Sequence, residues 1–212
     1  MTMAIADSHS WQPSLFEVSL PDLDLHFDHL LRHQLDDAAW VDHIPGWSSG
    51  ADVLFDWLVG RAPWHTEEIV IHARRLVQPR LLARWSCSDT DPPLPERLEA
   101  MRAALSARYG RRFDSVGANL YRDGRDSVAW HGDRIARTVR DPLVAIVSLG
   151  ETRRLLLRPV GGRTALTLAP ASGDLVVMGG TCQRTWQHTI PKVAAAGPRI
   201  SVTFRHSTND AA

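Results

Sequence analysis

Seven short apolar runs between residues 115 and 205 constrain the fold more strongly than any other feature of this 212-residue sequence. Glycine, proline and aspartate separate the runs, and no helical pattern lies between them. The runs span residues 115–121, 143–150, 153–158, 164–168, 174–178, 185–190 and 199–205. Strands that follow one another without intervening helices favour an antiparallel sandwich or barrel over alternating βαβ units. We therefore predict a mostly β protein of the jelly-roll class, whose two sheets enclose a pocket.

Two helices are predicted before this β region, and the first 45 or so residues indicate irregular structure with short elements. One helix spans residues 51–59, behind two candidate N-caps, Ser48 and Ser49. Its apolar residues at helical spacing are Val53, Leu54, Trp57 and Leu58. The other begins near Pro95 and ends at Gly110, because glycine commonly terminates helices. Its apolar stripe consists of Leu94, Leu98, Met101, Leu105 and Tyr109.

The net charge is zero, but the charges are unevenly distributed along the chain. Residues 1–60 carry ten acidic side chains and one basic side chain, a balance of −9. Residues 61–212 carry fourteen acidic and twenty-three basic side chains, a balance of +9. This composition excludes a uniformly basic nucleic-acid binder, so a nucleic-acid partner must meet a local patch. The alternative is that the charges form ordinary solvated faces.

The sequence contains no run of about 18 apolar residues, and it begins without the basic and apolar regions of a signal peptide. We therefore expect a soluble, cytoplasmic protein with no membrane partner. Its two cysteines, Cys87 and Cys182, are too few for a disulfide framework or a thiolate zinc site.

His131, Asp133 and His188 form the pattern that indicates chemistry, because two imidazoles and one carboxylate are the donors that hold non-haem Fe(II) on one face. Such a site leaves positions open for a co-substrate and O₂. Residues i and i+2 of an extended segment point the same way, so His131 and Asp133 can bind one ion. His188 follows Asp133 by 55 residues and must come from a distant strand. Taken alone the triplet is weak, since a histidine is more often a surface or core residue.

The last apolar run places Arg199, Ser201 and Arg205 on one face at a period of two. Burying an arginine there is costly without an anion, and a guanidinium pairs with a carboxylate through two hydrogen bonds. A dicarboxylate co-substrate would supply that anion. Asn119 and Tyr121 are likewise two residues apart, and they offer an amide and a phenol to a carboxylate. Taken singly, each of these residues also has an ordinary explanation, as an edge-strand arginine or as a turn or core residue.

Four segments in unbroken order resemble one known family. They are NLYRDGRDSVAWHGD, VAIVSLGETRRLLLR, GDLVVMGGTCQRTWQHTIPK and PRISVTFR. In order and spacing they resemble the AlkB family of Fe(II)/2-oxoglutarate-dependent dioxygenases, and especially its members that act on alkylated nucleobases. The resemblance covers about residues 115–206, with a fainter continuation upstream in VQPRLLARW, residues 77–85.

The resemblance implies a double-stranded β-helix (jelly roll) with flanking N-terminal helices. It implies an N-terminal extension with a nucleotide-recognition region over residues 1–110, a catalytic core over residues 111–207 and a tail over residues 208–212. His131, Asp133 and His188 would ligate Fe(II), and 2-oxoglutarate and O₂ would be the co-substrates.

The resemblance also implies a binding site for 2-oxoglutarate. Arg199 and Arg205 would lie near its carboxylates, with Arg205 paired to the distal one. Asn119 and Tyr121 match the family's N-x-Y, whose side chains help to hold the same co-substrate. Ser201 stands where many relatives have asparagine, and it can still form a hydrogen bond over a shorter reach.

Substrate contacts are implied upstream of the core, around a base taken out of its stack. Arg80 is the candidate contact to a phosphate or base edge, and Trp85 is the candidate stacking platform unless it simply packs on the sandwich. Many relatives continue H-x-D with acidic residues, whereas this chain has Arg134 and Ile135. Iron binding should survive this change, but the base selectivity of those relatives need not. Four further arginines would extend the positive surface: Arg122, Arg125, Arg153 and Arg154.

The function implied is oxidative dealkylation of N-alkylated nucleobases, such as 1-methyladenine and 3-methylcytosine, in DNA or RNA, with release of formaldehyde, succinate and CO₂. The expected partner is alkylated nucleic acid, and the chain is expected to be a monomer without an obligate protein partner. Two alternatives stay open. One is a hydroxylase of the same fold that acts on a modified tRNA base, a protein or a small molecule. The other is a binding module without catalysis, in which His131 and His188 are structural.

Overall fold

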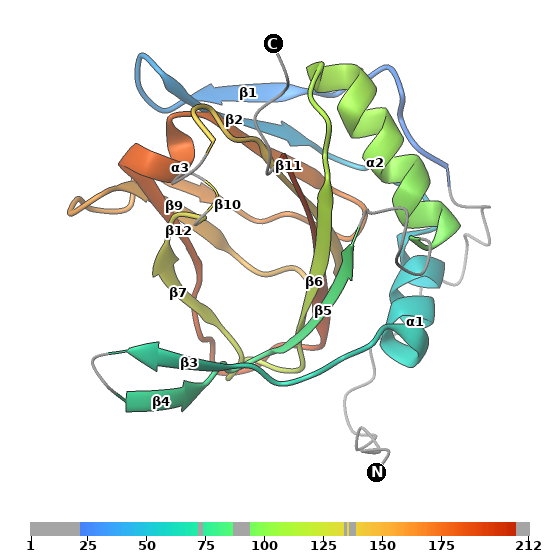
Figure 1. Ribbon diagram of the computed structural model, residues 1–212, viewed down its shortest axis with the longest axis vertical. Coiled ribbons are helices and arrows are strands. Elements are labelled where there is room, and N and C mark those ends of the chain that lie inside the picture. Colours follow the sequence, from blue (N-terminus) through green and yellow to red (C-terminus); the bar gives the residue numbers. More distant parts are fainter. Residues whose placement is uncertain (1–21, 72–73, 87–93, 134, 136–138, 207–212) are drawn as a thin grey trace.

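The computed structural model describes residues 22–71, 74–86, 94–133, 135 and 139–206. Within these residues two antiparallel sheets face each other, and a small hairpin and three helices surround them (Figure 1). This arrangement confirms the predicted mostly β, jelly-roll fold.

The larger sheet has seven strands within the described residues. In spatial order they are β1 (Leu31–Gln34), β2 (Ala39–Ile44), β11 (Leu175–Gly180), β8 (Val144–Gly150), β13 (Arg199–Arg205), β6 (Ser115–Tyr121) and β5 (Leu81–Ser86). The smaller sheet contains β10 (Leu166–Leu168), β9 (Leu155–Pro159), β12 (Trp186–Ile190) and β7 (Val128–His131). A separate hairpin pairs β3 (Glu68–Ile71) with β4 (Arg74–Val77).

All seven predicted strands are present, and β6 and β13 have the predicted bounds. The sequence pattern does not predict β1, β2 or β5, yet β2 pairs with β11 and β5 pairs with β6. β2 was missed because its sequence, AWVDHI, interrupts its apolar residues with an aspartate and a histidine. Residues on both sides of residue 110 therefore contribute to one sheet.

The helix α2 (Glu96–Tyr109) confirms the second predicted helix and its apolar stripe. Leu98, Met101 and Leu105 are buried. The helix ends at Gly110, whose φ of 61° lies in the left-handed region that favours glycine.

The helix α1 (Ala51–Arg61) confirms the first predicted helix, but its buried face is rotated from the prediction. Val53 and Trp57 are 51% and 39% exposed. The buried residues are Ala51, Leu54, Phe55 and Leu58. The predicted serine caps are also wrong, since Gly50 precedes the helix with a φ of 58° and no side chain caps it. The Ser49 hydroxyl instead accepts a hydrogen bond from the backbone N–H of Asp22.

Alternation along β8 and β13 separates two apolar cores. One face of the larger sheet packs under α1 and α2, which lie on its outer side in Figure 1. The even-numbered residues of β13, including Val202 and Phe204, belong to this core. The other face packs against the smaller sheet through residues such as Val144, Ile146 and Leu157. The odd-numbered residues of β13 therefore face the space between the sheets.

Candidate metal and co-substrate site

His131 and His188 lie directly opposite each other in the smaller sheet. They are register partners on β7 and β12, and their ring centroids are 4.2 Å apart. Asp133 follows the end of β7, and its carboxylate joins the two imidazoles so that all three donor atoms lie within 4.8 Å of one another. The structure thus brings the three predicted ligands together, although they come from segments 55 residues apart in sequence.

The tautomer of His131 is set by a backbone carbonyl. Its Nδ1 lies 2.8 Å from the carbonyl oxygen of Ala129, and because a carbonyl can only accept, Nδ1 carries the proton. Nε2 is therefore left as the lone-pair donor, and it lies 3.6 Å from Oδ1 of Asp133. Hydrogen bonding of the second ring nitrogen is the usual way in which proteins orient a metal-binding imidazole.

Burial and charge give the other two donors the protonation states that a metal requires. Burial, reinforced by His131, lowers the pKa of His188 to about 3, so its imidazole is neutral at neutral pH. Burial alone would raise the pKa of Asp133, but the positive charge of the adjacent Arg205 is the largest of the opposing effects, which together lower that pKa. Two imidazole nitrogens and one carboxylate are a chemically suitable donor set for Fe(II).

The backbone between the ligands fits tightly against the short helix α3 (Cys182–Thr185). A Cβ at Gly132 would lie 2.4 Å from the carbonyl oxygen of Gln183, so no other residue fits there without a shift. The Gln183 side chain, itself 5% exposed, accepts a hydrogen bond of 2.9 Å from the backbone N–H of Asp133. Gln183 thus holds the second ligand in place, and sequence patterns do not indicate this role.

A cavity of about 1260 Å³ lies between the two sheets, beside the triad. Its wall on the larger sheet contains every residue that the sequence predicts for co-substrate binding: Asn119, Tyr121, Arg199, Ser201 and Arg205. They share one face because β6 and β13 pair in register, with Asn119 opposite Ser201 and Tyr121 opposite Arg199.

Arg199 is the strongest indication of a bound anion. Its side chain is 1% exposed, and one guanidinium nitrogen, Nη2, donates to the hydroxyl of Ser148 at 2.9 Å. The other two nitrogens, Nε and Nη1, have no hydrogen-bond partner among the described residues. Burial lowers the pKa of Arg199, because the charge is removed from water without a counter-ion. A carboxylate that enters the cavity would supply the missing partner.

Arg205 lies at the other end of this face, next to the triad. Its Nε donates to Oδ2 of Asp133 at 2.6 Å. The pairing of Arg205 with the distal carboxylate, which the sequence resemblance implies, stays a prediction. A co-substrate that reaches the triad with one end would place its far end away from Arg205, toward Arg199.

The family model for the 2OG-Fe(II) oxygenase superfamily matches residues 60–205. The chain belongs to this superfamily. The match runs from the end of α1 to the end of β13 and includes the triad and the cavity wall. The triad is a fitting donor set for the superfamily's Fe(II), and the buried Arg199 is a fitting cation for its 2-oxoglutarate.

Named relatives confirm the AlkB resemblance within the superfamily. The chain is 30% identical over 174 residues to the alpha-ketoglutarate-dependent dioxygenase alkB homolog 3 of Bos taurus, which covers 73% of this chain and 61% of that protein. It is 31% identical over 193 residues to the DNA oxidative demethylase ALKBH2 of Arabidopsis thaliana, which covers 72% of this chain and 60% of that protein. The chain therefore spans about three fifths of the length of these curated relatives.

A solved structure, that of OsALKBH1, shares the fold. It matches with a TM-score of 0.52 at 14% identity, covering 83% of this chain and 100% of that chain. Among the described helices, none combines the length and the hydropathy that a membrane crossing requires.

The predicted substrate contacts are Arg80, Trp85 and Arg134, and the structure describes the first two. Arg80 lines the cavity, but its Nε donates to Oδ1 of Asn119 at 2.8 Å. Trp85 also lines the cavity, and it packs against the core beneath the helices as well. Arg134 lies outside the described residues, whereas Ile135 is part of the cavity wall.

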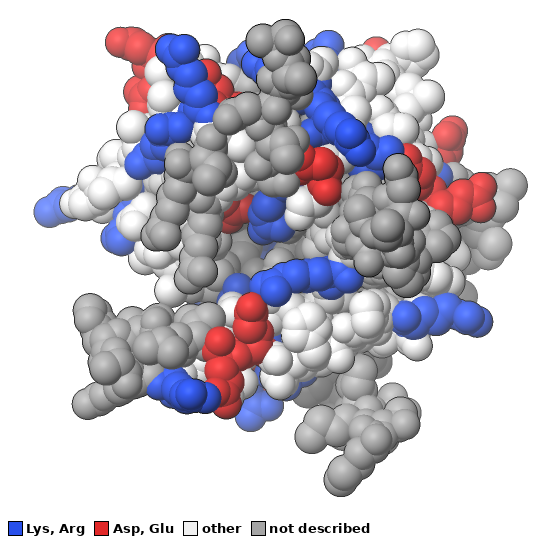
Figure 2. Space-filling model, in the orientation of Figure 1, with Lys and Arg blue, Asp and Glu red and all other residues white. Residues whose placement is uncertain are grey.

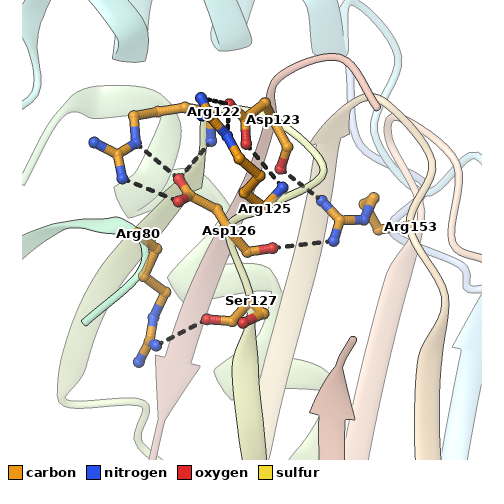
Figure 3. A network of polar contacts seen from close by, with 7 residues as sticks. All are labelled: Arg80, Arg122, Asp123, Arg125, Asp126, Ser127 and Arg153. Atoms are coloured by element: carbon orange, nitrogen blue, oxygen red, sulfur yellow. Dashed lines mark hydrogen bonds and ion pairs between the residues drawn. The ribbon is translucent and has the colours of Figure 1, made fainter. Parts of the chain in front are cut away.

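Three of the four arginines expected to extend the positive surface are engaged with other protein groups (Figure 3), whereas Arg154 is exposed. Arg153 is 3% exposed, and its guanidinium donates hydrogen bonds to three backbone carbonyls. It therefore connects buried backbone segments and does not add to the surface charge. Arg122 pairs with Asp126 at 2.8 Å and Arg125 pairs with Asp123 at 2.6 Å. Figure 2 accordingly shows basic and acidic side chains interspersed on the face that it presents. A nucleic-acid partner would meet a local patch, as the composition requires.

Proposed function

We propose that this chain is an oxidative dealkylase of N-alkylated nucleobases, such as 1-methyladenine and 3-methylcytosine, in DNA or RNA. The observation that supports it most strongly is the pairing of the His131, Asp133 and His188 triad with a buried, unsatisfied guanidinium in one cavity. The relatives suggest the substrate class, since one of them is a DNA oxidative demethylase. The products would be the repaired base, formaldehyde, succinate and CO₂.

The triad would hold Fe(II), which supplies the redox chemistry that couples decarboxylation of 2-oxoglutarate to oxidation of the alkyl carbon. The protein's own contribution is geometric and electrostatic. His131 has its tautomer fixed by Ala129, His188 is kept neutral by burial, and Asp133 is kept ionised beside Arg205. In these states each of the three side chains can offer a lone pair to the same metal ion.

We assign the distal carboxylate of 2-oxoglutarate to Arg199. Its two unpaired nitrogens, Nε and Nη1, retain N–H donors that a carboxylate can accept through charge-assisted hydrogen bonds. Tyr121 lies beside it, with its ring centroid 5.4 Å from the guanidinium carbon, and Ser148 anchors the remaining nitrogen. Arg205 is then placed to bind near the end of the co-substrate that reaches the metal, and Ser201 lies between the two arginines on the same face.

The base would enter from the part of the cavity that lies away from Arg199. The apolar Ile135 lines the cavity, whereas Trp85 is opposite Val116 and packs against the core beneath the helices. Arg134 and Ile135 stand where many relatives have acidic residues, so this protein would not select a base through its exocyclic amino group in that way. We expect the shape of the cavity to contribute more to base selectivity here than in those relatives.

Mass spectrometry of methylated oligonucleotides tests this proposal. Single-stranded and duplex oligonucleotides with one 1-methyladenine or 3-methylcytosine are incubated with protein, Fe(II), ascorbate and 2-oxoglutarate. We expect loss of the methyl mass that requires 2-oxoglutarate and is absent with His131→Ala. Succinate formation without loss of the methyl mass would instead favour a hydroxylase with another substrate, and absence of both changes would contradict the proposal.

A further inference from the structure

Arg80 makes its shortest side-chain contact with a residue of the co-substrate wall, not with solvent. Its Nε donates to Oδ1 of Asn119 at 2.8 Å, and both residues line the cavity. The contact joins the segment before β5 to the middle of β6, across 39 positions of sequence. Arg80 is only partly exposed, and burial lowers its pKa.

The chemistry of this contact determines which way the Asn119 amide faces. A guanidinium has five N–H donors and no acceptor, so the amide atom that meets it must be the oxygen. The amide nitrogen, Nδ2, then points away from Arg80 with two donors. Within the described part of the chain, no acceptor takes a hydrogen bond from this nitrogen. Asn119 therefore presents hydrogen-bond donors to the cavity.

Arg80 is itself held in place by the segment that leads into the metal-binding strand (Figure 3). Its Nη1 lies 3.4 Å from the carbonyl oxygen of Ser127, and the N–H of Ser127 donates to the carbonyl of Pro79 at 3.0 Å. Ser127 directly precedes β7, which ends at His131. Arg80 thus contacts the larger sheet at Asn119 and the approach to the smaller sheet at Ser127.

We infer that Arg80 is a positioning residue, which fixes the amide of Asn119 so that Nδ2 and not Oδ1 faces a carboxylate of 2-oxoglutarate. This inference rests on the proposed function, because it requires 2-oxoglutarate in the cavity. Without Arg80 the amide can rotate and place its oxygen against the carboxylate, which exchanges an attraction for a repulsion. Arg80 acts in this account on the co-substrate and not as the phosphate or base-edge contact that the sequence suggests.

Calorimetric titration of 2-oxoglutarate into protein loaded with Mn(II), without oxygen, tests the inference independently of turnover. Arg80→Met keeps the aliphatic stem but removes the donors, and we expect the dissociation constant to rise about tenfold. In an Asn119→Ala background, Arg80→Met should cause no further loss, because the residue that it positions is absent. Binding of a methylated oligonucleotide should change much less than binding of 2-oxoglutarate.

Asn119→Asp provides the sharper comparison with Asn119→Ala. Aspartate keeps an oxygen toward Arg80 and preserves the contact, but it replaces the two donors of Nδ2 with a second carboxylate oxygen. We expect it to weaken 2-oxoglutarate binding more than alanine does. A purely structural role for Asn119 predicts the opposite order. Arg125→Ala is the matched control, since Arg125 is exposed, belongs to the same polar network and does not contact Asn119.

The outcomes separate this inference from the proposed function. If wild-type protein with Mn(II) does not bind 2-oxoglutarate, the proposed function and this inference both fail. If the wild type binds and Arg80→Met binds equally well, only the inference is overturned. The same conclusion follows if Arg80→Met weakens only oligonucleotide binding, which would restore the direct substrate contact.

Discussion

Gly132 is the most constrained residue of the site, because a side chain there would collide with the carbonyl oxygen of Gln183. We predict that Gly132→Ala lowers the free energy of unfolding by about 1–3 kcal/mol, the usual cost of overpacking, and weakens metal binding. Denaturant unfolding and metal titration measure the two effects. Gly60→Ala is the control, since nothing lies within 4 Å of a Cβ at that helical position, and it should be neutral or slightly stabilising.

Gln183 shows how a residue outside the ligand set can control a ligand. Gln183→Leu conserves the approximate size of the side chain but leaves the buried N–H of Asp133 without its acceptor, a loss of about 1–3 kcal/mol. We predict weaker Mn(II) binding in a calorimetric titration. Gln187→Leu, next to His188 but partly exposed and bonded to Arg158, should leave Mn(II) affinity close to wild type. Equal effects of the two substitutions would mean that Gln183 has no special influence on Asp133.

Arg199 leads to an unusual expectation for stability. Because two of its buried nitrogens have no partner among the described residues, Arg199→Met should not destabilise the protein when 2-oxoglutarate is absent. The same substitution should raise the 2-oxoglutarate concentration needed for half-maximal turnover at least tenfold, by loss of a charge-assisted pair of about 2 kcal/mol. Thermal unfolding without co-substrate measures the stability of the variant, and a titration of 2-oxoglutarate in the turnover assay measures its co-substrate requirement. A variant that is unstable but binds 2-oxoglutarate normally would contradict the assignment.

At the scale of elements, Asp174 joins the start of β11 to the end of β2 and the turn after it. Its carboxylate accepts hydrogen bonds from His43 at 2.9 Å and from the N–H groups of Gly46 at 2.8 Å and Ala171 at 3.0 Å. Burial alone would raise the pKa of Asp174, but these hydrogen bonds outweigh it and lower that pKa. A carboxyl with a lowered pKa in the folded state stabilises the fold above the pKa of the unfolded chain, about 3.9.

This stabilisation is lost as the pH falls through the lowered pKa of Asp174. We therefore predict that wild-type protein loses more unfolding free energy between pH 6 and pH 3, measured by urea denaturation, than Asp174→Asn does. The exposed Asp37 serves as the control, and Asp37→Asn should follow the wild-type curve. Parallel curves for wild type and Asp174→Asn would show that this carboxylate does not connect the two strands energetically.

The sequence predicts best those elements whose local residue pattern also determines which side chains face the core and which face the cavity. β6 and β13 alternate strictly, so both their bounds and their cavity-facing residues follow from a period of two. α1 was located correctly but given the wrong buried face, because the side that packs depends on the sheet beneath it. The sequence predicts the two serines before it as caps. The Ser49 hydroxyl instead accepts a hydrogen bond from the backbone N–H of Asp22, a contact across 27 positions that no local pattern indicates.

At the scale of the whole molecule, the unpredicted features are those that depend on distant partners. The acidic N-terminal third contributes β1 and β2 to the larger sheet, where Asp42 is fully buried against Arg32 and Tyr109. The metal triad was predictable from residue chemistry and spacing. The assignment of the distal carboxylate to Arg199 that we propose was not, because only the three-dimensional position of Asp133 distinguishes the two arginines of β13.

We propose that one cavity of this protein couples consumption of 2-oxoglutarate to removal of an alkyl group from a base. The most direct measurement is the amount of succinate and of formaldehyde formed from a 1-methyladenine oligonucleotide with Fe(II), ascorbate and 2-oxoglutarate. We predict formaldehyde in proportion to succinate in the wild type, and neither product with Asp133→Ala, which removes one of three ligands while keeping the fold. Succinate without formaldehyde, or both products at wild-type levels with Asp133→Ala, would contradict the claim.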